Sequence, residues 1–433
     1  MNQRAAAPTS GGGRGNVGAM VRRVALAAAL VAAMAAPSVA SPLDLFGFGG
    51  RSPGMAGTGA ATTTDYDAVY LNPAGLADTP RKRATVGGLA GDFRLELDGQ
   101  PTATTSPRGL AIGGQVPMPL GGALKDRVGL GFGFYVPSEA INRARAPFPG
   151  TPTFVLLESR AFVVGLMVAV GVRLSPRWSV GVGVNSLAVL RGAIDVTIDG
   201  AGRITTQSEQ RLLTRFAPIV GARWRRSTTT DVALVVRAPS RSDYDITVTN
   251  DLGSTLPVTL PLIHIAGTAQ YDPLMVVAEA AWRPLDGLTL TGHLAWHRWS
   301  AFPRPTTNAV TGNPPQPALD FHDTAVPRVS VEYSRPGLGG TVAARAGYAF
   351  LWSPAPDQTR RETLYDNDRH ELAAGLGLAW PGAAVPLHLD AWVQLHHLAF
   401  RRYQRDPDVI APDRAHSTAG DIVVGGLTVG VDL

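Results

Sequence analysis

Cysteine is absent from this chain of 433 residues, charged residues are few, and no long apolar run follows the first forty positions. The absence of cysteine excludes disulfide scaffolds and zinc fingers. Charged residues make up 17% of the chain and hydrophobic residues 45%, the opposite of the balance in disordered chains. A polytopic helical membrane protein would need several apolar runs of about 20 residues. What remains is a soluble glycine-rich all-β protein, or a membrane protein that spans with alternating strands.

The first forty residues have the pattern of a secretory signal peptide. Arg22 and Arg23 precede the apolar stretch 24–36, and small residues up to Ala40 provide a cleavage site. The alternative, a spanning helix, is disfavoured because the stretch is too short for about 30 Å of hydrocarbon. We therefore expect residues 1–40 to be removed on export. Met20 is the better start for such a signal, which gives the hypothesis that the preceding residues are an incorrectly assigned extension.

The net charge of the chain gives no support for a nucleic-acid partner. Loss of residues 1–40 would remove four arginines and no acid, so the formal net charge would fall from +5 to +1. The remaining basic residues are scattered singly among strand-like segments, whereas phosphate binding requires a clustered stripe. We expect no nucleic acid among the partners.

From residue 84 to the end, apolar residues alternate with small or polar ones, which is typical of strands. At the C-terminus, for example, Leu427, Val429 and Val431 share one face, and Thr428 and Gly430 share the other. The pattern predicts fourteen strands: 84–97, 109–119, 127–136, 160–173, 178–198, 205–224, 231–247, 274–283, 288–300, 326–334, 341–352, 371–380, 387–400 and 421–433.

The connections between these strands differ in length according to the side on which they lie. Short turns at 175–177, 226–230, 284–287, 336–339 and 381–386 fall on one rim, and long loops at 137–159, 250–273, 301–325, 353–370 and 401–420 fall on the other. Outer-membrane barrels have this asymmetry, with short periplasmic turns, whereas a soluble sandwich has no reason for it. We predict a transmembrane antiparallel β-barrel. A closed barrel needs an even strand number, so 262–270 is assigned to a long outer loop or to an extension beyond Asp272 and Pro273.

Tryptophans provide a second indication of a membrane barrel. Trp178, Trp224, Trp282 and Trp380 lie at strand ends on the short-turn rim, and Trp296, Trp299 and Trp352 lie near the long-loop rim. Indole rings prefer the headgroup boundary, so two such belts are expected of a spanning barrel. The alternative is that they cap the core of a sandwich.

If the apolar face contacts lipid, the opposite face lines the lumen and is mixed in character. Its ionisable residues are Arg211, Arg215, Arg223, Arg237, Glu279, Arg283, Arg328, Glu332, Arg345, Glu371, Asp390, His293, His297, His388 and His396, and its apolar residues include Met167, Ile219, Val235, Met275, Val277 and Trp392. An apolar lumen with isolated arginines suits an amphipathic ligand, whose carboxylate would pair with a guanidinium. Arg215 and Arg345 are our candidates for that role. The alternative is that they pair with Glu332, Glu371 or Asp390 and fill the barrel.

Neither a catalytic nor a metal site is indicated by the spacing of reactive residues. His293 and His297 would lie together on a helix, but on a strand they are about 13 Å apart. No nucleophile elbow marks a hydrolase. We therefore expect no enzymatic activity, no cofactor and no metal.

Residues 41–83 do not alternate and are rich in small residues, which predicts a compact plug inside the barrel. This segment carries the run Gly-Phe-Gly-x-Arg-Ser-x-Gly-Met-x-Gly at 47–57 and the run Ala-Val-Tyr-x-Asn-Pro-Ala-Gly-Leu at 68–76. Both resemble the N-terminal hatch of the FadL/TodX family of outer-membrane transporters of hydrophobic compounds. The resemblance extends to the glycine-rich strand at 128–137 and to the strand count.

The resemblance implies a fourteen-stranded barrel over 84–433 that is closed by a hatch over 41–83. The hatch would include Asn72, Pro73, Ala74 and Gly75, which we take as gating residues. In the family, ligand can leave sideways through a gap beside the third strand, and Gly129, Gly131 and Gly133 would permit the kink that such a gap requires. The alternative for these glycines is ordinary packing against the hatch.

The function that this resemblance implies is passive uptake of long-chain fatty acids or other hydrophobic compounds across the outer membrane of a Gram-negative bacterium. Its partners would be a hydrophobic ligand, either a fatty acid or an aromatic hydrocarbon, and outer-membrane lipid, and we expect a monomer. A second hypothesis is a barrel that binds a partner in protein secretion or envelope assembly. A third is an outer-membrane hydrolase, for which no serine stands out.

Overall fold

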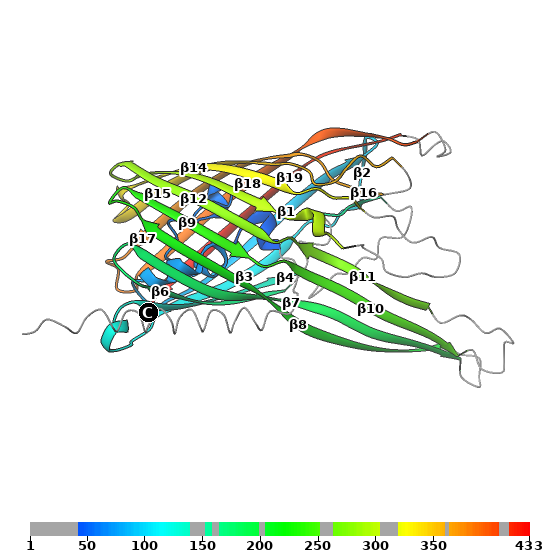
Figure 1. Ribbon diagram of the computed structural model, residues 1–433, viewed down its shortest axis with the longest axis horizontal. Helices are drawn as coiled ribbons and strands as arrows, with labels where there is room; N and C mark the ends of the chain where they lie inside the picture. The colour runs from blue at the N-terminus through cyan, green and yellow to red at the C-terminus, as the bar shows by residue number, and fades with distance from the viewer. Residues whose placement is uncertain are drawn as a thin grey trace, which may run out of the picture. The chain divides into compact units, whose positions relative to one another are not determined.

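The computed structural model describes residues 42–138, 152–157, 164–198, 204–251, 263–303, 319–359, 363–406 and 415–433. Its main feature is a closed barrel of fourteen antiparallel strands, in which β1 pairs with β19 to complete the ring (Figure 1). The barrel strands are β1 (Arg83–Leu97), β3 (Arg108–Pro117), β4 (Val128–Pro137), β6 (Gly165–Arg173), β7 (Trp178–Ile198), β8 (Ile204–Arg225), β9 (Thr230–Arg237), β12 (Met275–Leu285), β13 (Leu288–His297), β14 (Thr324–Gly337), β15 (Gly340–Leu351), β17 (Arg369–Trp380), β18 (Leu387–Gln404) and β19 (Ala415–Asp432). The predicted fold class and strand number are confirmed.

Alternation along each strand separates an outer apolar face from an inner one. On β9, Leu234 is 53% exposed, whereas its neighbour Val235 is fully buried. On β17, Leu372 and Leu376 are likewise exposed, whereas Glu371, the residue before Leu372, is buried. Because side chains of a strand point alternately to its two faces, the exposed row forms the apolar outer surface expected of a lipid-facing barrel.

One predicted strand, 231–247, is divided in the structure. It breaks at Ala238 and Pro239 into β9 and β10 (Ser240–Asp251), since proline has no N–H to donate to a ladder. β10 pairs with β11 (Ile263–Asp272) and lies parallel to the outer part of β7. Figure 1 shows these strands extending beyond the barrel together with β8. The segment 262–270 is therefore an extension, which is one of the two assignments that the sequence left open.

Short additional strands lie on the long-loop side. β2 (Gln100–Pro101) pairs with the end of β1, and β5 (Thr153–Phe154) pairs with β16 (Leu364–Tyr365). Around β5 and β16 the loops share an apolar cluster that includes Leu156, Tyr271 and Trp299. Trp299 is 3% exposed, so the prediction that it belongs to a lipid-facing belt is wrong. Its ring packs against Tyr271 and Phe302 inside this cluster.

The tryptophans of the short-turn rim lie where the alternation places them. Trp178 is 48% exposed and stacks on Trp224 across the β7–β8 pair, with ring centroids 5.7 Å apart. Trp282 is 53% exposed at the end of β12. Exposed indole rings at one level of an apolar surface are typical of a membrane interface.

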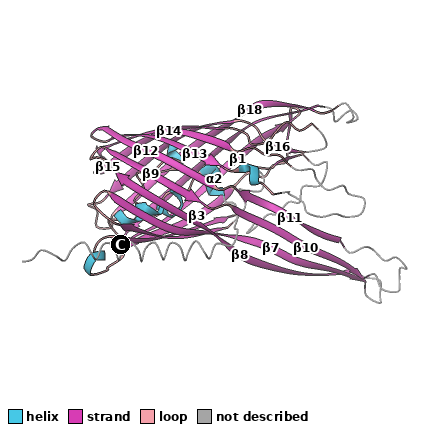
Figure 2. Cartoon of the chain, in the orientation of Figure 1, coloured by secondary structure: helices cyan, strands magenta, loops and turns pink. Residues whose placement is uncertain are grey.

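The N-terminal segment forms short helical turns that the barrel surrounds (Figure 2). They are α2 (Pro42–Phe46), η1 (Pro53–Met55), α3 (Ala68–Leu71) and η2 (Pro73–Asp78); two further turns, η3 (Gly122–Leu124) and η5 (Trp299–Ala301), connect strands. Proline at the first position of η1 and of η2 suits a helix start, where no N–H is required. No helix in the described residues is long and apolar enough to cross a membrane. We call residues 42–82 the hatch.

Candidate functional site

Asn72 is at the centre of the contact between the hatch and the barrel. Its side chain is fully buried, and its Oδ1 accepts a hydrogen bond of 3.0 Å from the N–H of Ala74, which caps η2. Its Nδ2 donates to the carbonyl of Ala60 at 2.8 Å and to that of Ala222 on β8 at 3.3 Å. One amide thus joins two parts of the hatch to a barrel strand.

Four neighbouring strands present glycine to the hatch at this place: Gly129 on β4, Gly171 on β6, Gly181 on β7 and Gly221 on β8. We call them the glycine wall. A Cβ at Gly181 would overlap the backbone of Pro73 and Ala74, and one at Gly171 would lie 2.6 Å from the N atom of Ala77. A side chain at Gly129, Gly171 or Gly181 would displace hatch backbone, and one at Gly221 would displace the side chain of Asn72. Glycine is therefore what lets η2 lie directly on the barrel.

Gly129, Gly131 and Gly133 all face the hatch. A Cβ at Gly131 would lie 2.7 Å from Val69 and one at Gly133 would lie 2.6 Å from the ring of Phe48. β4 pairs with β3 from Gly129 to Pro137 and with β6 from Val128 to Tyr135, without a register shift. Over these residues β4 is paired on both sides, and the three glycines pack against the hatch, which is the alternative given for them above. The lateral opening itself stays a prediction.

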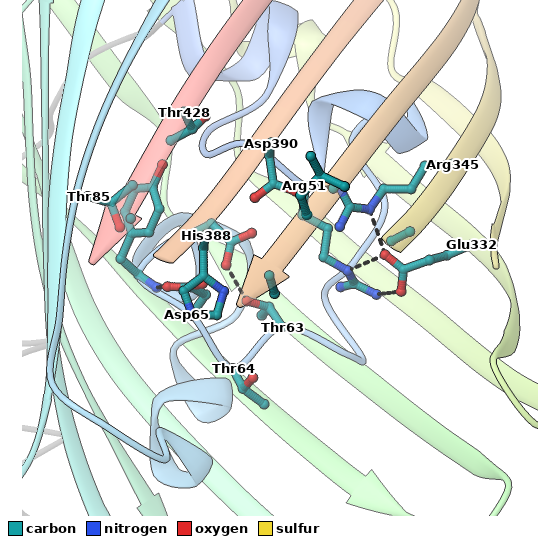
Figure 3. Close-up of a pocket in the computed structure, with 18 of the residues that line it drawn as sticks. Arg51, Thr63, Thr64, Asp65, Thr85, Glu332, Arg345, His388, Asp390 and Thr428 are labelled. Carbon is teal, nitrogen blue, oxygen red and sulfur yellow. Dashed lines mark hydrogen bonds and ion pairs between the residues drawn. The ribbon is translucent and has the colours of Figure 1, made fainter. Parts of the chain in front are cut away.

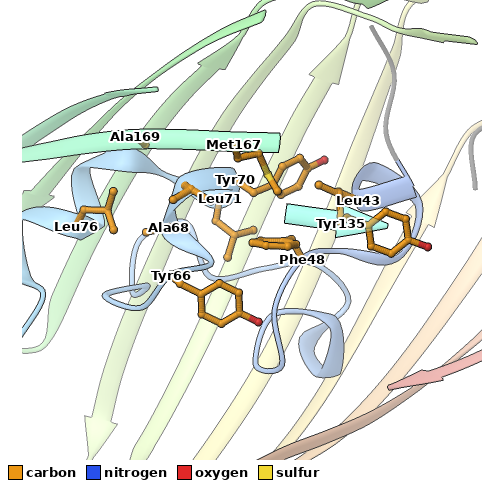
Figure 4. Packing of buried hydrophobic residues seen from close by; sticks show 11 residues of the cluster. Leu43, Phe48, Tyr66, Ala68, Tyr70, Leu71, Leu76, Tyr135, Met167 and Ala169 are labelled. Atoms are coloured by element: carbon orange, nitrogen blue, oxygen red, sulfur yellow. The ribbon is translucent and has the colours of Figure 1, made fainter. Parts of the chain in front are cut away.

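Aromatic side chains fill the space next to the glycine wall, as Figure 4 shows. Phe48 meets Tyr66 edge to face, with ring centroids 5.3 Å apart, and both belong to a buried cluster with Leu76, Met167 and Tyr135. Such burial is worth about 1.5–3 kcal/mol for each large side chain. On this side the hatch is held by apolar packing.

The opposite side of the lumen holds the hatch through charge. Glu332 on β14 accepts two hydrogen bonds of 2.8 Å from the hatch residue Arg51 and one of 2.6 Å from Arg345 on β15 (Figure 3). Arg345 also donates to Asp390 on β18 at 2.5 Å. We call Glu279, Arg328, Glu332, Arg345 and Asp390 the charged wall.

Glu279 on β12 is the most enclosed member of the charged wall. Its carboxylate accepts hydrogen bonds from the backbone N–H groups of Gly59 at 3.0 Å and Ala61 at 2.7 Å, and it lies 2.8 Å from Nδ1 of His293. Arg328 donates to the carbonyl of Ala56 at 2.6 Å. In these contacts barrel side chains bind backbone atoms of the hatch. Every residue has such backbone atoms, so no sequence motif within the hatch could indicate the contacts.

Ion pairs also hold the hatch near the short turns. Asp78 at the end of η2 pairs with Arg173, Arg223 and Arg225 on β6 and β8. At another point of the rim, Asp65 pairs with Arg83 at the start of β1. A charged contact therefore lies near each end of the segment 65–78.

Of the two arginines proposed to bind a ligand, Arg345 is occupied by Glu332 and Asp390, and its side chain is 7% exposed. This arrangement favours the alternative that it fills the barrel. Arg215 lies on β8 opposite Leu187, and its side chain is outside the described residues.

A cavity of about 290 Å³ separates the hatch from the charged wall on the short-turn side. Figure 3 shows Arg51, Asp65, Arg345, His388 and Asp390 around it. Threonines from the hatch and from β1, β15 and β19 line it together with these charged groups. Hydroxyl and charged groups around a cavity of this size suit water.

Above the hatch, three cavities of about 30 to 40 Å³ each meet at Asp44 of α2. The one beside β8 and β12 is lined by Val69, Tyr70, Ala217, Ile219 and Met275, so it is mainly apolar. Arg237 of β9 also borders it, with its guanidinium carbon 4.0 Å from the centre of the Tyr70 ring. The Nε of Arg237 is buried and has no hydrogen-bond partner among the described residues.

A comparison with family models matches residues 29–395 to the outer membrane protein transport family described as OMPP1/FadL/TodX. The chain belongs to this family. The resemblance seen in the sequence is confirmed, and the family places the protein among outer-membrane transport proteins. No curated protein matches the chain.

Solved structures of this family share the fold of the chain at low sequence identity. A FadL homologue from Pseudomonas aeruginosa is 15% identical with a TM-score of 0.59, and the match covers 92% of this chain and 99% of the homologue. The toluene transporter TodX of P. putida is 11% identical with a TM-score of 0.53 (90% and 99% covered), and the toluene transporter TbuX of Ralstonia pickettii is 13% identical with a TM-score of 0.52 (90% and 100% covered). At such identities the likeness concerns the fold alone.

Members of the family are transport channels. Among the described residues, no group of three or more carboxylates or histidines could hold a metal ion. The residues that sequence reasoning did not select were Glu279, Arg237 and Asp78. The first two were visible only as members of the inward-facing row, and the partners of Asp78 on β6 and β8 lie about 95 to 147 residues further along the chain.

Proposed function

We propose that this protein carries hydrophobic compounds, with long-chain fatty acids as the first candidates, passively across the outer membrane, and that the hatch is its gate. The observation that supports this most directly is the asymmetric contact of the hatch with the barrel: glycine and apolar packing predominate on the glycine wall, whereas hydrogen-bonded charges and a cavity of about 290 Å³ lie on the charged wall. A segment held in this way can leave the charged wall while one side stays anchored. Passage then follows the widened cavity toward the short turns.

The small cavities above the hatch support an amphipathic cargo. Their apolar lining would have to widen from about 30 Å³ to admit a hydrocarbon chain. Nη1 of Arg237 lies 3.9 Å from Asp44, but its Nε has no hydrogen-bond partner among the described residues, so this guanidinium can still donate to a carboxylate. Arg237 takes the role first assigned to Arg345, because the guanidinium of Arg345 is already shared between two carboxylates. An uncharged aromatic cargo would use the apolar lining without Arg237.

The cargo can be tested by equilibrium binding of a labelled long-chain fatty acid to the detergent-purified mature barrel, with unlabelled fatty acid and an aromatic hydrocarbon as competitors. We expect saturable binding that fatty acid displaces, and a loss of about tenfold in affinity in Arg237→Met. Displacement by the aromatic compound alone would indicate that the cargo is an aromatic hydrocarbon. Absence of saturable binding of either compound would contradict the proposal.

The gate can be tested separately by locking the hatch, because the chain has no cysteine of its own. Thr58 of the hatch and Ser330 of β14 are both buried, and their hydroxyl oxygens are 2.6 Å apart. In Thr58→Cys/Ser330→Cys the two sulfurs would take these places, close enough to form a disulfide. Oxidation should stop uptake of the labelled ligand by cells, and reduction should restore it.

The two single cysteine variants, treated with the same oxidant, are the matched controls and should keep full uptake. Formation of the disulfide is verified by mass spectrometry of the purified barrel. Full uptake by the oxidised double variant would contradict a hatch that leaves the charged wall, even if ligand binding were confirmed.

A further inference from the structure

The short-turn rim carries cations around most of its circumference. Exposed cations are present just before β1, in the β3–β4 connection, in the β6–β7 and β8–β9 turns, and near the end of β14. They are Lys82, Lys125, Arg177, Arg226 and Arg335. None of the five has an ion-pair partner within the described ranges.

Acidic residues on the same rim do not neutralise these cations. Within the described ranges the exposed carboxylates there are Asp126 and Asp286. Asp231 and Asp432 are largely enclosed and already paired, with Arg283 at 2.7 Å and with Arg83 at 2.6 Å. The exposed surface of the rim is therefore positive.

The long-loop rim differs, because its exposed charges are of both signs. Asp92 pairs there with Arg94 at 2.7 Å, and Asp98 lies 2.8 Å from His416. Among the described residues, the five exposed cations named above, which have no ion-pair partner, therefore lie on the short-turn rim.

Three of the rim cations extend the lipid-facing rows of their strands. Arg226 follows Trp224 by two residues, and Arg335 follows Tyr333, which is 49% exposed, by two residues. Lys82, which directly precedes β1, continues the alternate row of Ala84 and Val86, and Val86 is 51% exposed. Because alternate residues of a strand share a face and rise about 3.3 Å each, the rings of Trp224 and Tyr333 are each followed at about 7 Å by a cation.

This order, apolar surface, then aromatic belt, then cation, is that of a bilayer from hydrocarbon to headgroup phosphate. We propose that the rim binds the headgroups of anionic phospholipids in the leaflet that surrounds the short turns. Guanidinium and ammonium groups donate charge-assisted hydrogen bonds to phosphate oxygens, and five such groups around the barrel provide several separate contacts. The occupant is a lipid and not a protein because Lys82, Arg226 and Arg335 extend the lipid-facing rows.

The experiment uses the mature barrel reconstituted in bilayers that contain brominated phospholipid, which quenches tryptophan fluorescence on contact. Brominated phosphatidylglycerol is compared with brominated phosphatidylcholine. The protein should select phosphatidylglycerol, with a relative association constant of about five, since each basic group near an anionic surface contributes roughly that factor. In Lys82→Gln/Arg226→Gln/Arg335→Gln the constant should fall to about one.

The matched control removes three exposed cations from the long-loop rim, Arg94→Gln/Arg298→Gln/Arg402→Gln, and should retain the preference of the native barrel. Equal quenching by the two lipids in the native protein would overturn the proposal and would favour an acidic soluble partner as the ligand of the rim. An equal loss of preference in the control would also overturn it, because net charge alone would then be responsible.

Discussion

The hatch touches two parts of the barrel that differ in the contacts that predominate. On β4, β6, β7 and β8 it meets glycine, and its backbone lies directly on the strands. On β12, β14, β15 and β18 it meets Glu279, Glu332 and Arg345 and other charged residues, which reach it through long side chains. On this side too, η1 lies directly on glycine, at Gly347 of β15 and Gly375 of β17. A cavity of about 290 Å³ borders this second contact.

This difference shows how one barrel can both anchor and release a plug. Close backbone packing leaves no room for water, and dispersion contacts are lost at once if the surfaces part. Ion pairs beside a hydrated cavity can exchange partners with water, so their net contribution is smaller. The glycine wall is therefore expected to act as the fixed side and the charged wall as the side that opens.

The largest effect should come from filling the glycine wall. Gly181→Val would drive a side chain into the backbone of Pro73 and Ala74, so the hatch could not seat, at a cost of about 3 kcal/mol or more. Limited proteolysis of the reconstituted barrel should cut within the hatch of this variant. Gly292→Val on β13, where no atom lies within 4 Å of a Cβ, is the control and should resist the protease like the native protein.

The next effect concerns the charged wall. Arg51→Met removes the two hydrogen bonds to Glu332 but leaves that carboxylate paired with Arg345, so we expect a loss of about 2 kcal/mol in hatch seating while the barrel remains folded. Planar-bilayer conductance should rise because water enters from the cavity side, whereas migration on gels with and without heating should be native. Conductance as low as in the native protein would show that the charged wall does not open. Arg94→Gln on the exterior is the control.

Asn72 tests the anchored side by a smaller change. Asn72→Ala removes the cap of η2 and the contact with Ala222, at a cost of about 1–2 kcal/mol. Uptake of the labelled ligand should change while heat-modifiable migration is unaffected. Unchanged uptake would count against a role of η2 in gating.

The smallest effect should be a pH dependence of the stability of the seated hatch, caused by Asp67 beside the cavity. Burial, reinforced by the charge of Asp65, raises the pKa of the hatch residue Asp67 to about 7, despite its hydrogen bond with Thr63 and the nearby Arg51. A pKa that is higher in the seated hatch than in the released one means that stability is greatest at low pH and falls as the pH rises through 7. Between pH 6 and pH 8 the loss should be about 1 kcal/mol.

Hydrogen exchange of hatch amides at these two pH values would measure this loss. Asp67→Asn, which cannot titrate, should abolish the difference. If the native hatch were equally protected at pH 6 and pH 8, the cavity side would not respond to Asp67.

Much of the fold could be predicted because it depends on local pattern. Alternation from residue 84 onward and the sorting of loops by length predicted the strand number and the membrane-facing surface, and only the break at Pro239 was missed. The proline that causes the break is visible in the sequence, but apolar residues continue to alternate on both sides of it, so a single strand was predicted. Trp299 was placed wrongly because a tryptophan at a strand end looks the same whether it faces lipid or a loop cluster.

Predictions for the site succeeded where a motif was involved and failed where partners were distant. The runs around Gly47 and Asn72 located the hatch, since they are contiguous in sequence. Arg345 was chosen as a ligand cation, but its partners Glu332 and Asp390 lie on two other strands, and no spacing rule brings them together. The same reason concealed Glu279, whose partners are backbone N–H groups of the hatch.

By itself, the sequence determined that this chain forms a lipid-facing barrel with a small-residue plug, because strand periodicity and short motifs are set by neighbouring residues. Only the tertiary structure decided which glycines serve as a seat and which arginines are already neutralised. It also decided that a cavity of about 290 Å³ lies on the charged side. Closing the barrel between β1 and β19 sets residues hundreds of positions apart side by side, and the balance of charge and space inside follows from that closure.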